Sequence, residues 1–209
     1  MLGVSNSLLF SRAPVRSLIF EYNSDFTSSI DGYEQTSVTD GTINFTSNDS
    51  GPDGAGGWLK AVFDTTQTGQ SGINKNLGWA SKNGTAEMGS TKKGDEFELS
   101  GKIYLQETGS DHWDGTGTVR TGVIFGTPNH QDQFEQSGLS VLNVEQNTNT
   151  SFNWSATSSV GIPNFSYIDN LIFPNWLSLS GGGSRFPQAG ATFYIKDINL
   201  KIYRISPKF

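Results

Sequence analysis

The 209-residue sequence contains no cysteine, so its fold cannot depend on disulfide bonds or on metal ions held by thiolates. It has no run of about 18 apolar residues, and no membrane-spanning helix is expected. Only 14 Lys and Arg residues stand against 20 Asp and Glu residues, which gives a net charge of −6. No segment concentrates the basic residues that a nucleic-acid groove requires, so nucleic acid is not an expected partner.

The amino-terminal stretch MLGVSNSLLFSRAPVRS has no basic residue ahead of its apolar residues, and polar residues interrupt them. This pattern argues against a signal peptide. The absence of cysteine fits assembly in a reducing cytoplasm.

Residues that favour turns and strands are abundant. There are 25 Gly residues, and aromatic residues make up 12% of the chain. No apolar period of 3.6 residues persists over three turns, so helices are not expected. Strands are predicted at 17–22, 42–46, 57–64, 95–106, 119–126, 138–145, 151–157 and 191–205, with a broken one at 167–180 that contains Pro174. About ten strands without intervening helices predict an all-β, antiparallel β-sandwich, and 17–209 is expected to form it as a single domain.

Residues 1–16 precede the first clear strand and mix Gly, Ser, Asn and Pro with apolar residues. Among these, Leu8, Leu9 and Phe10 would be poorly solvated on a free arm. We therefore expect a short assembly arm that docks on its own domain or on a neighbouring chain. A first edge strand is the alternative.

The longest β-favouring stretch is 191–205, ATFYIKDINLKIYRI. Its apolar residues occupy odd positions at Phe193 and Ile195, and even positions from Ile198 onwards. Side chains alternate between the faces of a strand, so both sets share one face only if an extra residue is inserted between them. A β-bulge at Lys196 and Asp197 is predicted. The alternative is a strand buried on both faces, where this alternation has little meaning.

The segment 95–106, DEFELSGKIYLQ, alternates most regularly. One face is predicted to be core, and the other is expected to be solvated or to bind a ligand. The predicted core face carries Phe97, Leu99, Gly101, Ile103 and Leu105, and the other carries Glu96, Glu98, Lys102, Tyr104 and Gln106.

Catalytic chemistry has weak candidates. Glu96 and Glu98 alternate as the acids of a retaining glycosidase do, but one of them would need an apolar surrounding, and their expected neighbours are polar. Solvated surface glutamates are therefore the preferred interpretation. His112 and His130 lie in polar loops without a second histidine at ligand spacing. No catalytic residue is assigned.

The turn-rich loop NDSGPDGAGG could hold Ca²⁺ through Asp49, Asp53 and backbone carbonyls. It lacks the alternating acids of known calcium loops, so an ordinary turn is preferred.

A binding role requires less chemistry, because sugar rings stack their CH faces on aromatic side chains while polar groups bind the hydroxyls. Tyr104 is the best candidate, with Lys102 and Gln106 beside it, and Trp113 in a polar loop is the second. Both aromatic residues could instead cover a neighbouring chain. The strand-associated residues Trp58, Trp79 and Trp154 are expected in the core.

Four segments in order, DFTSSIDGYEQ, GGWLKAVFD, KKGDEFELSGKIYL and ATFYIKDINLKI, resemble the carbohydrate-binding-module type of jelly roll. This galactose-binding-like sandwich is used in secreted glycosidases and in many phage virion proteins. The resemblance covers about 17–203 and implies a jelly roll. It also implies that Asp197 can help to bind a structural Ca²⁺, although Lys196 replaces a neighbouring acid and disfavours the metal.

The arm, the missing signal peptide and the absence of cysteine resemble a phage structural protein more than a secreted hydrolase module. The expected function is therefore a non-enzymatic virion protein, a capsid decoration or tail appendage, that contacts other virion proteins. It would be a homo-oligomer assembled in the host cytoplasm, with no cofactor. One alternative is a glycan-binding adhesin or receptor-binding module that meets a host surface glycan. Another is a glycoside hydrolase with a lectin-like fold.

Overall fold

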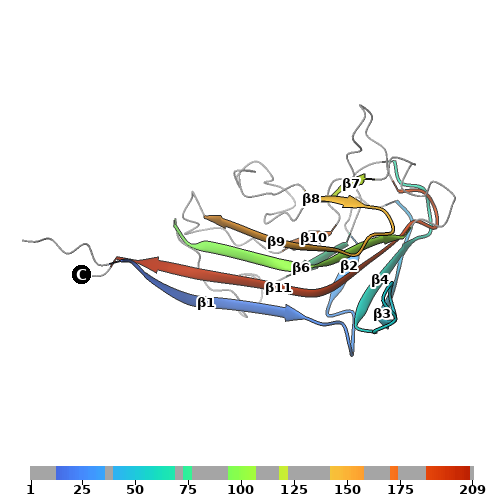
Figure 1. Cartoon of the computed structure of the whole chain (residues 1–209). Helices are drawn as coiled ribbons and strands as arrows, with labels where there is room; N and C mark the ends of the chain where they lie inside the picture. Colours follow the sequence, from blue (N-terminus) through green and yellow to red (C-terminus); the bar gives the residue numbers. More distant parts are fainter. Residues whose placement is uncertain are drawn as a thin grey trace, which may run out of the picture.

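The protein was analysed as a computed structural model, which describes residues 13–35, 40–68, 73–76, 94–106, 118–121, 142–157, 170–173 and 187–207. These residues form eleven strands, β1 to β11, and no helix (Figure 1). Within them, no helix is long and apolar enough to cross a membrane.

The strands form antiparallel sheets. The largest has six strands: β1 (Val15–Ser24), β3 (Ile43–Asp49), β4 (Trp58–Phe63), β6 (Glu96–Gln106), β9 (Thr150–Thr157) and β11 (Thr192–Ser206). Its order is β3-β4-β11-β6-β9, and β1 also pairs with β11. A second sheet has the order β10 (Asn170–Phe173), β5 (Ile73–Asn76) and β2 (Tyr33–Gln35), and β7 (Thr118–Thr121) pairs with β8 (Leu142–Glu145). The predicted all-β antiparallel sandwich is confirmed.

Strand β11 is the centre of the six-stranded sheet. One of its sides pairs with β6 from Thr192 to Tyr203. The other side pairs first with β4, from Thr192 to Ile195, and then with β1, from Ile198 to Ser206. Strand β11 therefore changes partner on this side at Lys196 and Asp197, and in Figure 1 it runs between β1 and β6.

The predicted β-bulge lies at this change of partner. Lys196 pairs with Lys102 and Asn199 pairs with Ser100, so both Asp197 and Ile198 lie opposite Gly101. Asp197 adopts a positive φ of 54°, a conformation in which Asp is less strained than most residues. The prediction is confirmed with one adjustment: Lys196 keeps its cross-strand partner, and the extra residue lies within Asp197–Ile198.

The two larger sheets share one core. Tyr33 of β2 and Ile73 of β5 belong to the same buried cluster as the inward side chains of the six-stranded sheet. Burial of Leu99, Ile103 and Leu105 confirms the predicted core face of β6. The cluster further contains Phe26, Ile43, Leu59, Ala61, Phe63, Phe152, Ala191, Phe193, Ile195, Ile198, Leu200 and Ile202.

One expected boundary was wrong, and two short strands were not identified from the sequence. The arm was expected to extend to Arg16, but β1 begins at Val15, because Val15 and Arg16 pair with Ser206 and Ile205. Strands β2 and β5 were not predicted, because three and four residues are too few to show a periodic pattern. The arm residues Leu8, Leu9 and Phe10 lie outside the described residues.

Candidate functional site

The face of the six-stranded sheet that points away from the core is called the outer face. On β6 it carries Lys102, Tyr104 and Gln106, as the alternation predicted, because the intervening Ile103 and Leu105 are buried. Cross-strand pairing aligns Tyr104 with Tyr194 of β11. The backbone therefore brings two tyrosines side by side on this face.

Three aromatic side chains form a row across strands β4, β11 and β6. The ring centroids of Tyr104 and Tyr194 lie 6.0 Å apart, and those of Tyr194 and Trp58 lie 6.3 Å apart, both in edge-to-face geometry. Trp58 is fully buried, Tyr194 is 6% exposed and Tyr104 is half-buried. Trp58 and Tyr194 thus support Tyr104, and Tyr104 is the most accessible ring of the row.

Polar groups surround this row. The Tyr104 hydroxyl donates to Asn147 Oδ1 at 3.3 Å, and the Tyr194 hydroxyl donates to Gln106 Oε1 at 2.8 Å. Burial raises the pKa of Tyr194, so its hydroxyl stays protonated as a donor. The Lys60 ammonium lies 5.8 Å from the Tyr194 ring centroid. We call Lys60, Tyr104, Gln106, Asn147 and Tyr194 the Tyr104 patch.

Asn147 reaches the patch from the turn between β8 and β9. Its backbone N–H donates to the Leu105 carbonyl at 2.8 Å, and its φ is 56°, a left-handed conformation that Asn tolerates better than most residues. The turn is therefore fixed against the end of β6, and the side-chain amide of Asn147 stands beside Tyr104.

Lys102 lies on the outer face two residues before Tyr104, as predicted. Its ammonium contacts Asp197 Oδ2 at 2.9 Å, and both side chains are exposed. The bulge therefore brings a carboxylate to Lys102. The ammonium of Lys102, predicted as a polar group beside Tyr104, is therefore already paired with a carboxylate of the protein.

Trp58 is covered by the loop 50–57, in which the sequence offered a calcium site. Gly51 packs directly on the indole ring, where any Cβ would clash. Asp53 Oδ1 accepts hydrogen bonds from Trp58 Nε1 at 2.9 Å and from the Ala55 backbone N–H at 3.0 Å. Trp58 is buried as expected, but beneath this loop and outside the main core.

The loop and the bulge do not fit a calcium ion. Lys196 donates from Nζ to the Gly56 carbonyl at 2.6 Å, which places a positive charge on a loop carbonyl that a calcium ion could otherwise use. Asp49 accepts from the Gly51 N–H, and Asp197 faces Lys102. In the part of the chain that the structure describes, no group of three or more His, Cys, Asp or Glu residues could hold a metal ion.

Glu96 and Glu98, the weak catalytic candidates, both contact one guanidinium. Arg16 Nε donates to Glu96 at 2.7 Å, and Arg16 Nη2 donates to Glu98. The guanidinium also lies 3.3 Å from the Tyr203 ring centroid, and the bond to Glu96 is the main cause of a raised pKa of Arg16. These groups are exposed, which is the arrangement of a surface ion pair and not of an apolar pocket around a proton-donating acid.

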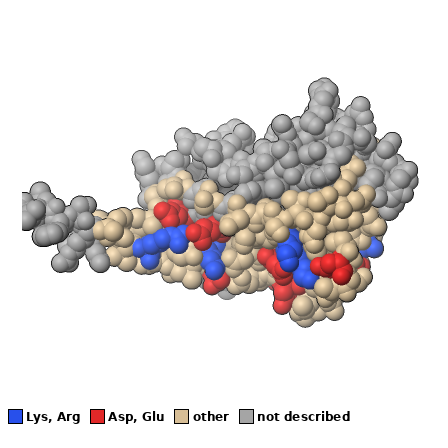
Figure 2. All heavy atoms as spheres, in the orientation of Figure 1, with Lys and Arg blue, Asp and Glu red and all other residues tan. Residues whose placement is uncertain are grey.

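Basic and acidic side chains lie next to one another on the side of the molecule shown in Figure 2 and do not form separate charged fields. Lys201 Nζ, for example, is 3.5 Å from Glu21 Oε1. The described residues on this side offer no extended basic strip to a phosphate backbone.

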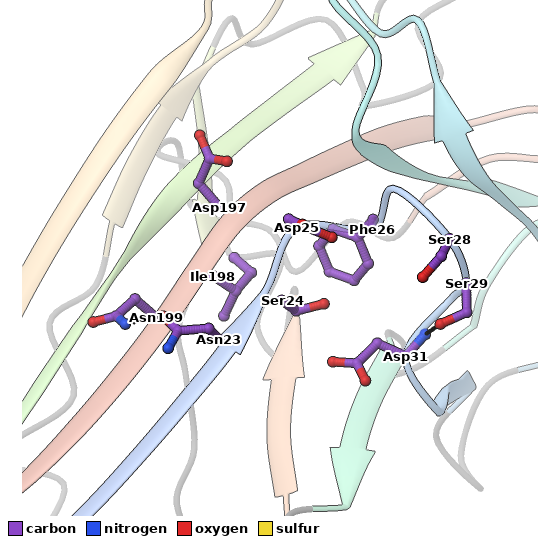
Figure 3. A pocket seen from close by; sticks show the side chains of 10 residues that line it. All are labelled: Asn23, Ser24, Asp25, Phe26, Ser28, Ser29, Asp31, Asp197, Ile198 and Asn199. Atoms are coloured by element: carbon purple, nitrogen blue, oxygen red, sulfur yellow. Dashed lines mark hydrogen bonds between the residues drawn. The ribbon is translucent and has the colours of Figure 1, made fainter.

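A pocket of about 440 Å³ lies where β11 changes partner (Figure 3). Asp25 and Asp31 belong to it, and Figure 3 shows the Asp197 carboxylate pointing away from both. Hydrogen bonds from Thr27 hold the pKa of Asp25 below its usual range. Phe26 is only 2% exposed, so the pocket has polar groups but no aromatic surface. It is lined by Asn23, Ser24, Asp25, Phe26, Ser28, Ser29, Asp31, Asp197, Ile198 and Asn199.

Some candidates lie outside the described residues: Trp113, Trp79, His112 and His130. Three members of the Tyr104 patch, Lys60, Asn147 and Tyr194, were missed from the sequence. Tyr194 could have been found, because it lies between the apolar residues Phe193 and Ile195 and must face the other side of the strand. Asn147 carries no comparable signal, since it belongs to a turn.

No family model matches the sequence, and the search of curated proteins found no match. Solved structures resemble the fold. The tandem CBM22-1–CBM22-2 domain of Paenibacillus barcinonensis Xyn10C aligns with 95% of this chain and 49% of its own, at a TM-score of 0.50 and 12% identity. The arabinose-bound α-L-arabinofuranosidase MgGH51 aligns with 88% of this chain and 27% of its own, at a TM-score of 0.53 and 12% identity.

The single CBM22-1 xylan-binding domain of the same Xyn10C aligns with 95% of this chain and 100% of its own, at a TM-score of 0.49 and 12% identity. This chain spans about half or less of the tandem domain and of the arabinofuranosidase. At these identities the similarity shows the fold alone. The fold is a jelly-roll sandwich of the carbohydrate-binding-module type, as the sequence resemblance predicted.

Proposed function

We propose that this chain is a non-catalytic carbohydrate-binding protein that holds a glycan against the Tyr104 patch. The observation that carries the proposal is a partly exposed tyrosine ring that packs edge-to-face beside Tyr194, which in turn packs on the buried Trp58. A supported ring offers a fixed apolar surface to the CH face of a sugar. The carbohydrate-binding modules among structures of the same fold support the choice of ligand class.

The polar members of the patch suit sugar hydroxyls. Gln106 and Asn147 present side-chain amides that donate and accept, and Lys60 presents an ammonium that donates. Lys60 is the one charged member of the patch, and the neighbouring Lys102 is paired with Asp197, so no cluster of positive charge forms here among the described residues. The expected ligand is therefore a neutral polysaccharide or oligosaccharide and not a highly sulfated one.

The test is binding to a glycan array and to soluble polysaccharides by affinity electrophoresis, followed by calorimetry on the best ligand. Tyr104→Ala should weaken binding roughly tenfold, the worth of one aromatic contact. Asn147→Ala should weaken it less. Thr157→Ala, on the exposed far end of β9, is the matched control and should bind as the wild type does. Unchanged affinity in a Tyr104→Ala/Gln106→Ala variant would refute this site.

Enzymatic activity is the competing function. A glycoside hydrolase would release reducing sugar from the bound polysaccharide, and Glu98→Gln would abolish that release. The non-catalytic proposal expects no release from wild type or variant. Turnover that depends on Glu98 would overturn it.

The same proposal places the protein on a bacteriophage particle, as a capsid decoration or tail appendage bound to other virion proteins. The features that support this setting are in the sequence: no cysteine, an apolar arm before β1 and the family resemblance. Mass spectrometry of purified particles should find the protein at a fixed copy number. Deleting residues 1–14 keeps β1 intact, and normal copy number after this deletion would contradict an assembly role for the arm.

A further inference from the structure

The exposed large apolar side chains of the described residues all lie on one strand. They are Val15, Leu18 and Ile19 of β1, which are 39%, 49% and 36% exposed. Single apolar residues on a surface are ordinary, but the adjacent Leu18 and Ile19 form a small exposed apolar patch, whereas Val15 pairs with Ser206 and faces the opposite side of the strand from Leu18. An exposed apolar patch of this kind is typical of a surface that contacts another protein.

Strand β1 is also at an edge of the six-stranded sheet. Its partner among the described strands is β11, and in Figure 1 it lies at the rim of the sheet beside β11. A strand paired on one side presents unpaired N–H and C=O groups on the other, and proteins usually protect such an edge with polar residues.

The other edge strands of this sheet follow that rule. Strand β3 exposes Asn44 and Thr46, and β9 exposes Ser151 and Asn153. The edge formed by β1 therefore exposes apolar side chains, whereas the edges formed by β3 and β9 expose polar ones. Apolar residues at a free edge are what strand addition uses.

We propose that two copies of this chain pair through β1 across a twofold axis and join their six-stranded sheets into one continuous sheet. A twofold axis normal to the sheet makes β1 antiparallel to its copy, which is the pairing that two edge strands can form without distortion. The occupant of the β1 edge is thus the same strand of a second molecule.

A bulge in β1 restricts the register. Leu18 pairs with Tyr203 and Phe20 pairs with Ile202, so Ile19 is an extra residue. Because of this insertion, Leu18 and Glu21 both lie on the outer face, although they are three positions apart. Residues directly opposite one another must share a face. When Leu18 lies opposite Ile19 of the partner subunit, each Arg16 lies opposite Glu21 of the partner subunit.

The matching of faces selects this register, and the Arg16–Glu21 pair adds to contacts that Arg16 makes with Glu96 and Glu98, and Glu21 with Lys201, in their own subunit. A shift of one residue would set Arg16, on the outer face, opposite an inward-facing aromatic residue of the other copy. A shift of two residues would set Leu18 opposite Glu21 in one direction and opposite Ser17, which faces the other side of the strand, in the other direction. The selected register has two Leu18–Ile19 pairs at its centre and an Arg16–Glu21 pair on each side. The contact between two β1 strands is small, so we expect a weak dimer that forms only as the protein concentration rises.

Disulfide trapping tests the register, because the chain has no cysteine of its own. A mixture of Leu18→Cys and Ile19→Cys proteins should cross-link into the mixed dimer faster than either protein alone. A mixture of Asn44→Cys and Thr46→Cys proteins, on the polar edge strand β3, is the matched control. Cross-linking no faster than in this control would overturn the proposal.

Sedimentation velocity over a wide concentration range tests the association. The wild type and Thr46→Lys should dimerise, and Leu18→Lys/Ile19→Lys should stay monomeric with an unchanged circular dichroism spectrum. A wild type that is monomeric throughout would refute the dimer. So would a chain that dimerises only after residues 1–14 are deleted, because its own arm would then cover β1. Neither result bears on glycan binding at the Tyr104 patch.

Discussion

Gly101 of β6 lies opposite the bulge of β11, and Ile198 occupies the space that a side chain at Gly101 would need. A Cβ at Gly101 would stand 2.6 Å from Ile198 Cδ1 and 2.7 Å from Phe152 Cζ. The missing side chain of Gly101 on β6 therefore leaves the space that the extra residue of β11 requires. The bulge is built from both strands, although only β11 contains the insertion.

Gly101→Ala should destabilise the protein by roughly 1–3 kcal/mol, the usual cost of adding a methyl group to a filled core. Urea unfolding followed by fluorescence measures the change. Ser100→Ala, at the neighbouring position, is the control and should change stability little. Truncating the opposing side chain in Gly101→Ala/Ile198→Val should recover part of the loss, and an additive double variant would contradict the proposed clash.

Lys196→Met should destabilise the protein by about 2 kcal/mol, because it removes a charged hydrogen bond but keeps the aliphatic stem. The lost bond joins Nζ to the Gly56 carbonyl, and the ammonium also lies 5.5 Å from the Trp58 ring centroid. Proteolysis within 50–57 should accelerate. The matched control is Lys201→Met, whose exposed ion pair contributes less than about 1 kcal/mol. Equal effects of the two substitutions would reject the specific role of Lys196.

Arg204→Met should cost about 3 kcal/mol, because it leaves the carboxylate of Asp95 in the interior without its guanidinium. Arg204 Nη2 lies 3.0 Å from Asp95 Oδ2, and the Asp95 side chain is 2% exposed. The comparison that isolates the pair is the double variant Asp95→Asn/Arg204→Met, which should be less destabilised than the sum of the single variants. Simple additivity would show that the two groups are not coupled.

Stability should fall in acid. Hydrogen bonds lower the pKa of three exposed carboxyls below the usual 3.8: Thr68 acts on Asp40, the Ala55 N–H on Asp53 and the Thr42 N–H on Asp64. A carboxyl whose pKa is lower in the folded state adds stability above its unfolded pKa and loses it as the pH falls through its folded pKa. The urea midpoint should therefore decline below about pH 4.

The triple variant Asp40→Asn/Asp53→Asn/Asp64→Asn separates this effect from general charge repulsion. An Asn side-chain carbonyl still accepts these hydrogen bonds but does not titrate in this range. The variant should show a shallower decline of the urea midpoint between pH 5 and pH 2 than the wild type. Parallel curves would assign the acid sensitivity to other groups.

The sequence predicted features that depend on alternation along one strand. Leu99, Ile103 and Leu105 are buried, Tyr104 faces outwards, and the change of parity before Ile198 correctly located the bulge. Each of these features follows from the alternation of side chains between the two faces of a strand. This alternation can be read from the order of neighbouring residues alone.

Features that depend on separate segments could not be predicted. Trp58 was expected in the core, but it is buried by a loop on the outer face, and its strand pattern does not show which face a loop will cover. The pocket near Asp31 joins 23–31 to 197–199, and Asn147 reaches the patch from a turn. No local pattern in the sequence connects these segments.

The central position of β11 also governs the order of folding. Strand β11 follows β1, β4 and β6 in the chain, and Val15 of β1 pairs with Ser206. None of its three ladders can form until 192–206 has left the ribosome, so the sheet is completed only after that segment is synthesised. Such long-range pairing makes folding slow and leaves β1, β4 and β6 without their common partner on the nascent chain. Protection of these strands by a chaperone is therefore expected to matter more for this protein than for a helical domain of the same size.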